Sequence, residues 1–96
     1  METKKQLKPL HTYKVEFIEY GRYATQEVNF TAYSPKQAKK FFYDWWKNHH
    51  TSYATVILVS QLDDAYAKRL TMQTTGETVE ERFKRQSDYI YRREQQ

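Results

Sequence analysis

Two segments near the start of the chain alternate between apolar and polar residues. They run from residue 10 to 19 and from residue 23 to 33. Alternation with a period of two is typical of strands that bury one face, because successive side chains point to opposite sides of a sheet. The apolar positions of the two segments are Tyr13, Val15, Phe17, Val28, Phe30 and Ala32.

The sequence Tyr20-Gly21-Arg22-Tyr23 between these segments predicts a two-residue type II′ hairpin turn, with Gly21 at its first central position. Such a turn would set Tyr20 opposite Tyr23 and Val15 opposite Val28. It would also bring the two apolar sets to the same side of the sheet, as a half-buried hairpin requires. We therefore expect an antiparallel hairpin in this register.

A helix is predicted to start after Ser34. Ser34 is a good N-cap, Pro35 fits the first helical position, and Gln37 completes a capping box. At 100° per residue, one arc of this helix is apolar and the opposite arc is rich in lysine. The apolar arc holds Ala38, Phe41, Phe42, Trp45 and His49.

The second half of the chain predicts a strand, an ambiguous segment and a helix. The strand at 54–61 has two apolar faces, which favours a central place in the sheet. Residues 62–73 fit either a fourth strand or a short helix, and the strand is slightly favoured. A second capping box, Thr78 with Glu81, opens a helix that reaches to about residue 93.

These elements predict an α+β fold. We expect a small antiparallel sheet of three or four strands, an element order of ββαβ(β)α, and two helices packed on one face. Residues 10–96 would form a single domain, preceded by a flexible basic arm at 1–9.

Composition adds information about the core and the compartment. Aromatic residues make up 17% of the 96 residues, so large rings can fill a small core. Cysteine is absent, which favours a reducing, cytoplasmic location. The first residues lack the apolar stretch of a signal peptide, and no apolar run is long enough to span a bilayer. We expect no membrane association.

Residue patterns for catalysis and for metal binding are weak. Only two glycines occur, so no glycine-rich phosphate loop is possible, and a nucleophile-elbow serine is missing. His11 could reach His49 across the helix and sheet, but no carboxylate is placed beside them. Glu16 and Glu27 would face each other on the open face of the hairpin, where water screens them. We therefore expect no enzyme activity, no metal and no cofactor.

Nucleic-acid binding has partial support from charge. The net charge is +4, and cations next to exposed tyrosines suit phosphates and unpaired bases. Candidate contacts lie on both helices. They are Lys36, Lys40, Tyr43, Lys47, Arg82, Arg85, Tyr89 and Arg93.

Protein binding is the favoured alternative. Tyrosine and tryptophan are preferred interface anchors, because each offers a large area with a polar tip at a low entropic cost. The hairpin carries Ile18, Tyr20 and Tyr23 on its outer side, and Trp46 lies at the edge of the first helix's apolar arc.

The sequence thus predicts a small non-catalytic binding module, monomeric or homodimeric. Its partner would be a nucleic-acid-processing protein or a nucleoprotein complex, and it would act by covering a surface of that partner. Small, cysteine-free, aromatic-rich domains are frequent among accessory and inhibitor proteins of bacteriophages and mobile elements, and the analogy is one of type only. Direct binding of RNA or DNA is the alternative function.

Overall fold

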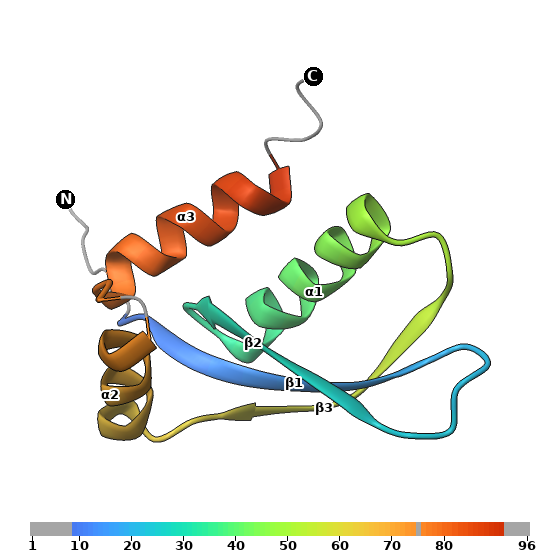
Figure 1. Cartoon of the computed structure of the whole chain (residues 1–96), viewed down its shortest axis with the longest axis horizontal. Coiled ribbons are helices and arrows are strands. Elements are labelled where there is room, and N and C mark those ends of the chain that lie inside the picture. Colours follow the sequence, from blue (N-terminus) through green and yellow to red (C-terminus); the bar gives the residue numbers. More distant parts are fainter. Residues whose placement is uncertain (1–8, 75, 92–96) are drawn as a thin grey trace, which may run out of the picture.

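The computed structural model describes residues 9–74 and 76–91, which form three strands and three helices. The predicted arm lies, except for Pro9, outside the described residues. The elements are β1 (His11–Glu19), β2 (Gln26–Ala32), α1 (Pro35–His49), β3 (Ala54–Gln61), α2 (Asp64–Thr74) and α3 (Val79–Tyr91). The strands make one antiparallel sheet in the order β2-β1-β3, and α1 and α3 lie on one side of it (Figure 1). The α+β prediction is confirmed.

The β1–β2 hairpin has the predicted register but a different turn. Val15 pairs with Val28 and Tyr13 with Phe30, as expected. Pairing stops at Phe17 and Gln26, however, so the predicted two-residue turn is wrong. The chain instead turns over residues 19–22, where the Arg22 N–H donates to the Glu19 carbonyl at 2.9 Å and Gly21 has φ +89°. A positive φ at the third turn residue is the geometry that favours glycine.

Strand β3 lies at an edge of the sheet, so the prediction of a central position is wrong. It pairs antiparallel with β1 alone, with a register shift between Glu16 and Phe17. Its inward side chains, Val56 and Val59, pack partly against the core, while Ile57 and Leu58 are exposed. The two apolar faces of this strand therefore do not indicate burial on both sides.

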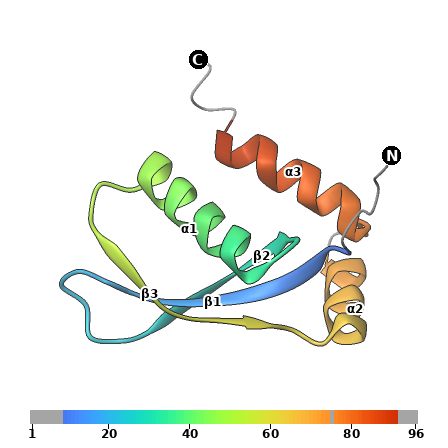
Figure 2. The same cartoon turned by 180° about the vertical axis from the view of Figure 1, so that it is seen from behind.

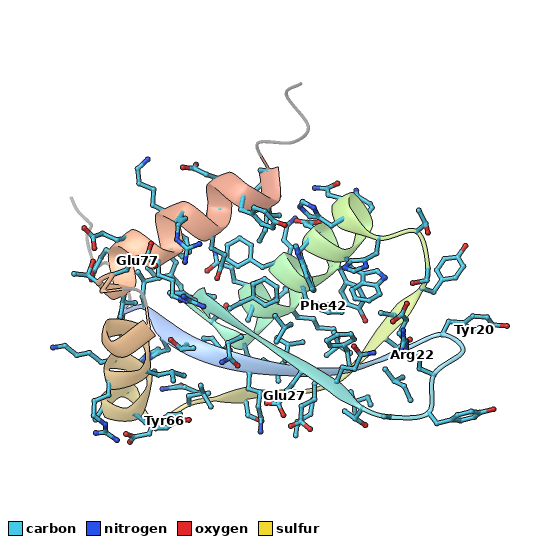
Figure 3. The ribbon with its side chains drawn as sticks, viewed as in Figure 1. Tyr20, Arg22, Glu27, Phe42, Tyr66 and Glu77 are labelled. Atoms are coloured by element: carbon cyan, nitrogen blue, oxygen red, sulfur yellow. The ribbon has the colours of Figure 1, made fainter. Side chains whose placement is uncertain are left out.

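The core lies between the sheet and α1, where Phe42 is fully buried (Figure 3). Helix α1 starts as predicted, with the Gln37 N–H donating to the Ser34 hydroxyl at 3.1 Å and Pro35 in the first turn. Rings from the sheet and the helix interlock, with centroids 4.7 Å apart for Phe17 and Phe42. The buried hydrophobic cluster comprises Tyr13, Val15, Phe17, Phe30, Ala32, Ala38, Phe41, Phe42, Trp46 and Ile90.

Helix α3 covers the β2 side of the same layer. Its capping box is formed as predicted, because the Thr78 hydroxyl accepts from the Glu81 N–H and the Glu81 carboxylate accepts from the Thr78 N–H. Ile90 enters the core. The Gln86 amide makes two 2.8 Å hydrogen bonds to the backbone N–H and C=O of Thr31, so it pairs with the edge of β2 as a neighbouring strand would.

Residues 64–74 form helix α2, and the slightly favoured prediction of a fourth strand is wrong. The Asp63 carboxylate accepts a hydrogen bond from the Tyr66 N–H at 3.0 Å and thereby caps the first turn. Ala67 is buried, and α2 contacts β1. Seen from behind, α2 stands at the end of the sheet, away from the layer of α1 and α3 (Figure 2).

Within the described residues, no helix has the length and apolar character needed to cross a membrane.

Candidate functional site

Three exposed tyrosines gather at one end of the sheet. Tyr20 is 81%, Tyr23 100% and Tyr53 80% exposed. The chain segments that carry them are adjacent, because the Tyr20 N–H donates to the Tyr53 carbonyl at 2.8 Å. Figure 3 shows Tyr20 at the tip of the loop that leaves β1, pointing away from the molecule. We call Tyr20, Tyr23 and Tyr53 the tyrosine end.

Glu19 fixes the base of the tyrosine end. Its carboxylate accepts a 2.7 Å hydrogen bond from the Ser52 hydroxyl and lies 3.2 Å from the Arg22 guanidinium nitrogen Nε. The hydrogen bond from Ser52 and the charge of Arg22 lower the pKa of Glu19. The loop after β1 and the segment before β3 are therefore joined by side chains as well as by backbone, and the three tyrosines project from an ordered base.

Tyr53 is not among the residues predicted from the sequence. In an antiparallel pair, the end of one strand lies beside the start of its partner. Tyr53 directly precedes β3, and Glu19 at the end of β1 pairs with Ala54. Identifying this neighbour requires knowing that β3 pairs with β1, which the residue pattern alone does not reveal.

Of the other two predicted protein-binding residues, Ile18 is half-buried on the open sheet face and Trp46 is buried. Trp46 is 6% exposed, so the prediction that it presents a surface ring is wrong. Its ring packs on Phe17, and its indole N–H donates to the Ser52 carbonyl at 2.8 Å. Trp46 thus supports the segment that leads to Tyr53 from inside the molecule.

The predicted basic stripe of α1 is on the surface, but two of its four members are engaged. Lys36 and Lys47 are exposed. The Lys40 ammonium donates to Asp44 at 2.8 Å, and the Tyr43 hydroxyl accepts from the Val56 N–H at 3.0 Å. Tyr43 is therefore tied to β3, which limits its ability to stack on a base. We call Lys36, Lys40, Tyr43 and Lys47 the basic face.

The predicted residues of α3 add little free positive charge to the basic face. Arg85 binds both carboxylate oxygens of Glu77, which raises the pKa of Arg85. Tyr89 stacks on His49 with parallel rings 4.6 Å apart. Arg82 is half-buried, and Arg93 lies outside the described residues.

The histidines do not come together. His11 lies 2.8 Å from an Asp64 carboxylate oxygen and contacts Gln61, at the end of the sheet where α2 begins. His49 stacks on Tyr89, and His50 stacks on Trp46 with centroids 3.8 Å apart. In the part of the chain that the structure describes, no group of three or more metal-ligating side chains is assembled.

Glu16 and Glu27 are paired across the hairpin, as the register predicted. Glu27 points away from the helices into solvent (Figure 3), and Glu16 lies 3.6 Å from the Lys14 ammonium. The pair stands on an open sheet face rather than in a cavity.

Among the hollows lined by described residues, one lies apart from the tyrosine end and another adjoins the base of the tyrosine end at Glu19 and Ser52. The first, of about 440 Å³, lies between the start of β1, α2 and the start of α3. The second, of about 530 Å³, follows the end of α1 and includes Glu19.

Comparison with known proteins finds no matching family model, no similar curated protein and no similar solved structure. The proposals below therefore rest on the geometry and chemistry of this chain.

Proposed function

We propose that the protein is a non-catalytic binding module that covers a surface of a partner protein, with the tyrosine end as its main contact. The observation that supports this function is the grouping of Tyr20, Tyr23 and Tyr53, all at least 80% exposed, on an ordered base. Exposed rings contribute large contact areas and lose little side-chain entropy on binding. Because Arg22 is paired with Glu19, this end offers hydrophobic area and hydroxyl groups more than net charge.

A nucleoprotein complex, or a protein that processes nucleic acid, is the class of partner that fits both surfaces. Such an assembly presents protein surface to the tyrosine end and phosphates to the basic face. Long-range attraction by the net charge of +4 would speed the encounter, while the tyrosines would supply affinity. An accessory or inhibitor role in a phage or mobile element stays a prediction.

Affinity capture from an extract of the native host tests the function. Wild type should retain the same partner protein after nuclease treatment and at high salt, whereas Tyr20→Ala with Tyr23→Ala should lose it. Tyr66→Ala is the matched control, since Tyr66 is also an exposed tyrosine but lies on α2. Retention of the partner by the double variant would contradict the proposal.

Direct binding of RNA or DNA is the second candidate, favoured by the exposed ammonium groups of Lys36 and Lys47. In gel-shift titrations with single-stranded and duplex RNA and DNA, affinity would then fall steeply with salt. Lys36→Glu with Lys47→Glu would abolish binding, and Tyr20→Ala would leave it unchanged. Loss of binding on nuclease treatment in the capture experiment would also favour this alternative.

A further inference from the structure

Part of the outer edge of β3 has backbone groups available for pairing. The Leu62 N–H donates to the Thr12 carbonyl at 2.9 Å, and Ser60 and Leu58 are in register with Lys14 and Glu16. Backbone groups alternate in direction along an antiparallel strand. The N–H and C=O groups of Val59 and Gln61 therefore point away from β1, toward the outside of the sheet.

Before the register shift, this edge is bonded to α1 at Val56. The Tyr43 hydroxyl accepts from the Val56 N–H, so the backbone of β3 is already bonded before the register shift. The open portion consequently runs from Ile57 to Gln61. Its two large aliphatic side chains, Ile57 and Leu58, are 55% and 52% exposed.

Beyond the register shift, this open portion lacks the charged residues and prolines that protect most sheet edges against pairing. Natural edge strands are commonly blocked by lysine, proline or other charged residues. The sequence of β3, Ala-Thr-Val-Ile-Leu-Val-Ser-Gln, has no charged residue and no proline. On the adjacent strand, Lys14 and Glu16 neutralise each other at 3.6 Å. The surroundings of the edge are therefore nearly neutral, although the whole molecule is basic.

The opposite edge of the sheet is protected in its described part. Gln86 occupies the backbone groups of Thr31, and Glu27 adds a charge to the exposed stretch of β2. Pairing of β3 with β2 of another molecule, which would build open-ended filaments, is disfavoured by both features. Neither the Gln86 hydrogen bonds nor the charge of Glu27 opposes pairing of β3 with β3 of another molecule.

We propose that two copies of this chain associate through their β3 edges, antiparallel about a two-fold axis, to form a continuous six-stranded sheet. A second copy fits because it brings the same uncharged edge and the same exposed Ile57–Leu58 pair, so that apolar side chains meet without repulsion between like charges. Because the open portion is centred on Val59, Val59 pairs with Val59 of the second copy and Gln61 pairs with Ile57, which brings the two Leu58 side chains close across the joined strands. This inference goes beyond the proposed function and does not depend on it.

The arrangement has a consequence for binding. Tyr53 directly precedes β3, so antiparallel pairing places the two tyrosine ends at opposite ends of the joined sheet. If the tyrosine end is the contact surface proposed above, the dimer is a bivalent binder whose two contact surfaces face away from each other. Two sites on one partner assembly could be held together with an avidity greater than either single affinity.

Molar mass measured by light scattering over a range of protein concentrations tests the dimer. Wild type should rise from the monomer mass to twice that mass as concentration increases. Ile57→Lys with Leu58→Lys should remain monomeric throughout, with an unchanged circular dichroism spectrum, because both side chains are exposed in the monomer. Tyr23→Lys, a control that adds charge at a fully exposed site, should dimerise like wild type. A monomeric wild type at every concentration, or a dimeric double variant, overturns the proposal.

Amide hydrogen exchange provides a second, variant-free test. The N–H groups of Val59 and Gln61 should exchange more slowly as the protein concentration rises, while the exposed loop amide of Tyr23 should not respond. If wild type dimerises but the exchange of the Val59 and Gln61 amides is independent of concentration, then another surface joins the copies and the proposal fails.

Discussion

Asp44 links two helices through one carboxylate. It accepts hydrogen bonds from the Lys40 ammonium at 2.8 Å and from the Tyr91 hydroxyl at 2.6 Å. Burial raises the pKa of this carboxyl group, but the hydrogen bonds from Lys40 and Tyr91 and the nearby positive charges outweigh that effect, so its pKa is lowered overall. The ionised form is therefore favoured by the folded state.

Replacement of Asp44 should reveal this preference in the stability of the fold. A lowered folded-state pKa contributes stability above the unfolded pKa of about 4, and this contribution is lost as the pH falls through the folded value. We expect Asp44→Asn to lower the free energy of unfolding by about 1 kcal/mol at neutral pH. The difference in unfolding free energy between variant and wild type should become smaller at acidic pH.

Urea unfolding of the two proteins at neutral and at acidic pH measures the effect. Asp88→Asn is the matched control, because Asp88 lies on α3 and its ion pair among the described residues is an exposed 3.9 Å contact with Lys84. It should change stability very little at either pH. An equal loss of unfolding free energy in both variants would show that the contacts of Asp44 with Lys40 and Tyr91 stabilise the fold no more than the exposed ion pair of Asp88 does.

The exposure of a side chain was predicted correctly from the sequence where at most one other part of the fold lies against it. It was predicted wrongly where two parts do. Tyr20 and Tyr23 lie on a loop beyond the paired strands, and both are exposed as predicted. Trp46 lies between the sheet, where its ring packs on Phe17, and the segment before β3, where its indole N–H donates to the Ser52 carbonyl. These two neighbours widen the buried arc of α1, so a residue at the edge of the predicted arc became part of the core.

At the scale of elements, Gln86 connects α3 to β2. Thr31 is fully buried, and the Gln86 amide supplies partners for both its backbone groups. Gln86→Met keeps the length of the side chain but leaves a buried N–H and C=O unpaired. We expect this change to destabilise the fold by about 1–3 kcal/mol.

Chemical denaturation and exchange of the Thr31 amide measure this effect. The amide should exchange faster in Gln86→Met than in wild type, and the midpoint of unfolding should fall. Lys84→Met is the control on the same helix, since Lys84 is exposed and should tolerate the change. Slow exchange of Thr31 in the Gln86 variant would show that another group replaces the amide.

The hairpin shows which part of an element can be predicted from its residues. The alternation limited the register to shifts of two residues, because a shift by one residue would have put the two apolar sets on opposite faces. The position of the bend at Gly21 and Arg22 then selected the observed register. The turn depended on a remote contact, since Tyr20 pairs with Tyr53 and not with Tyr23. Local turn preferences do not contain that information.

The second half of the chain was harder to predict for a similar reason. The strand at 54–61 is apolar on both faces, which usually indicates a central strand, yet Ile57 and Leu58 remain exposed at an edge. Residues 64–74 fit both helical and strand periodicities, and capping by Asp63 decides for the helix. If β3 pairs with a second copy as proposed, that copy covers the exposed side chains of Ile57 and Leu58. The pattern of a single chain then reflects contacts that form only in the dimer.

At the scale of the whole molecule, α2 is packed less firmly than the sheet, α1 and α3. The sheet, α1 and α3 share one hydrophobic cluster, whereas Ala67 is the buried residue that α2 contributes among its residues of described burial. The contact between His11 and Asp64 at the start of α2 is mostly exposed to solvent on the Asp64 side. Helix α2 is therefore expected to open without the rest of the fold.

Native-state hydrogen exchange at increasing denaturant should separate the two parts. The amides of residues 67–70 should exchange through a local opening of low free energy, while those of Val15 and Phe42 should require global unfolding. Ala67→Gly should lower the opening free energy of α2 by about 1 kcal/mol and leave that of Phe42 unchanged. Ala38→Gly, which alters a buried alanine of α1, should instead lower the free energy of global unfolding. Equal protection of α2 and α1 in wild type would mean that α2 unfolds with the core, despite its single described buried side chain.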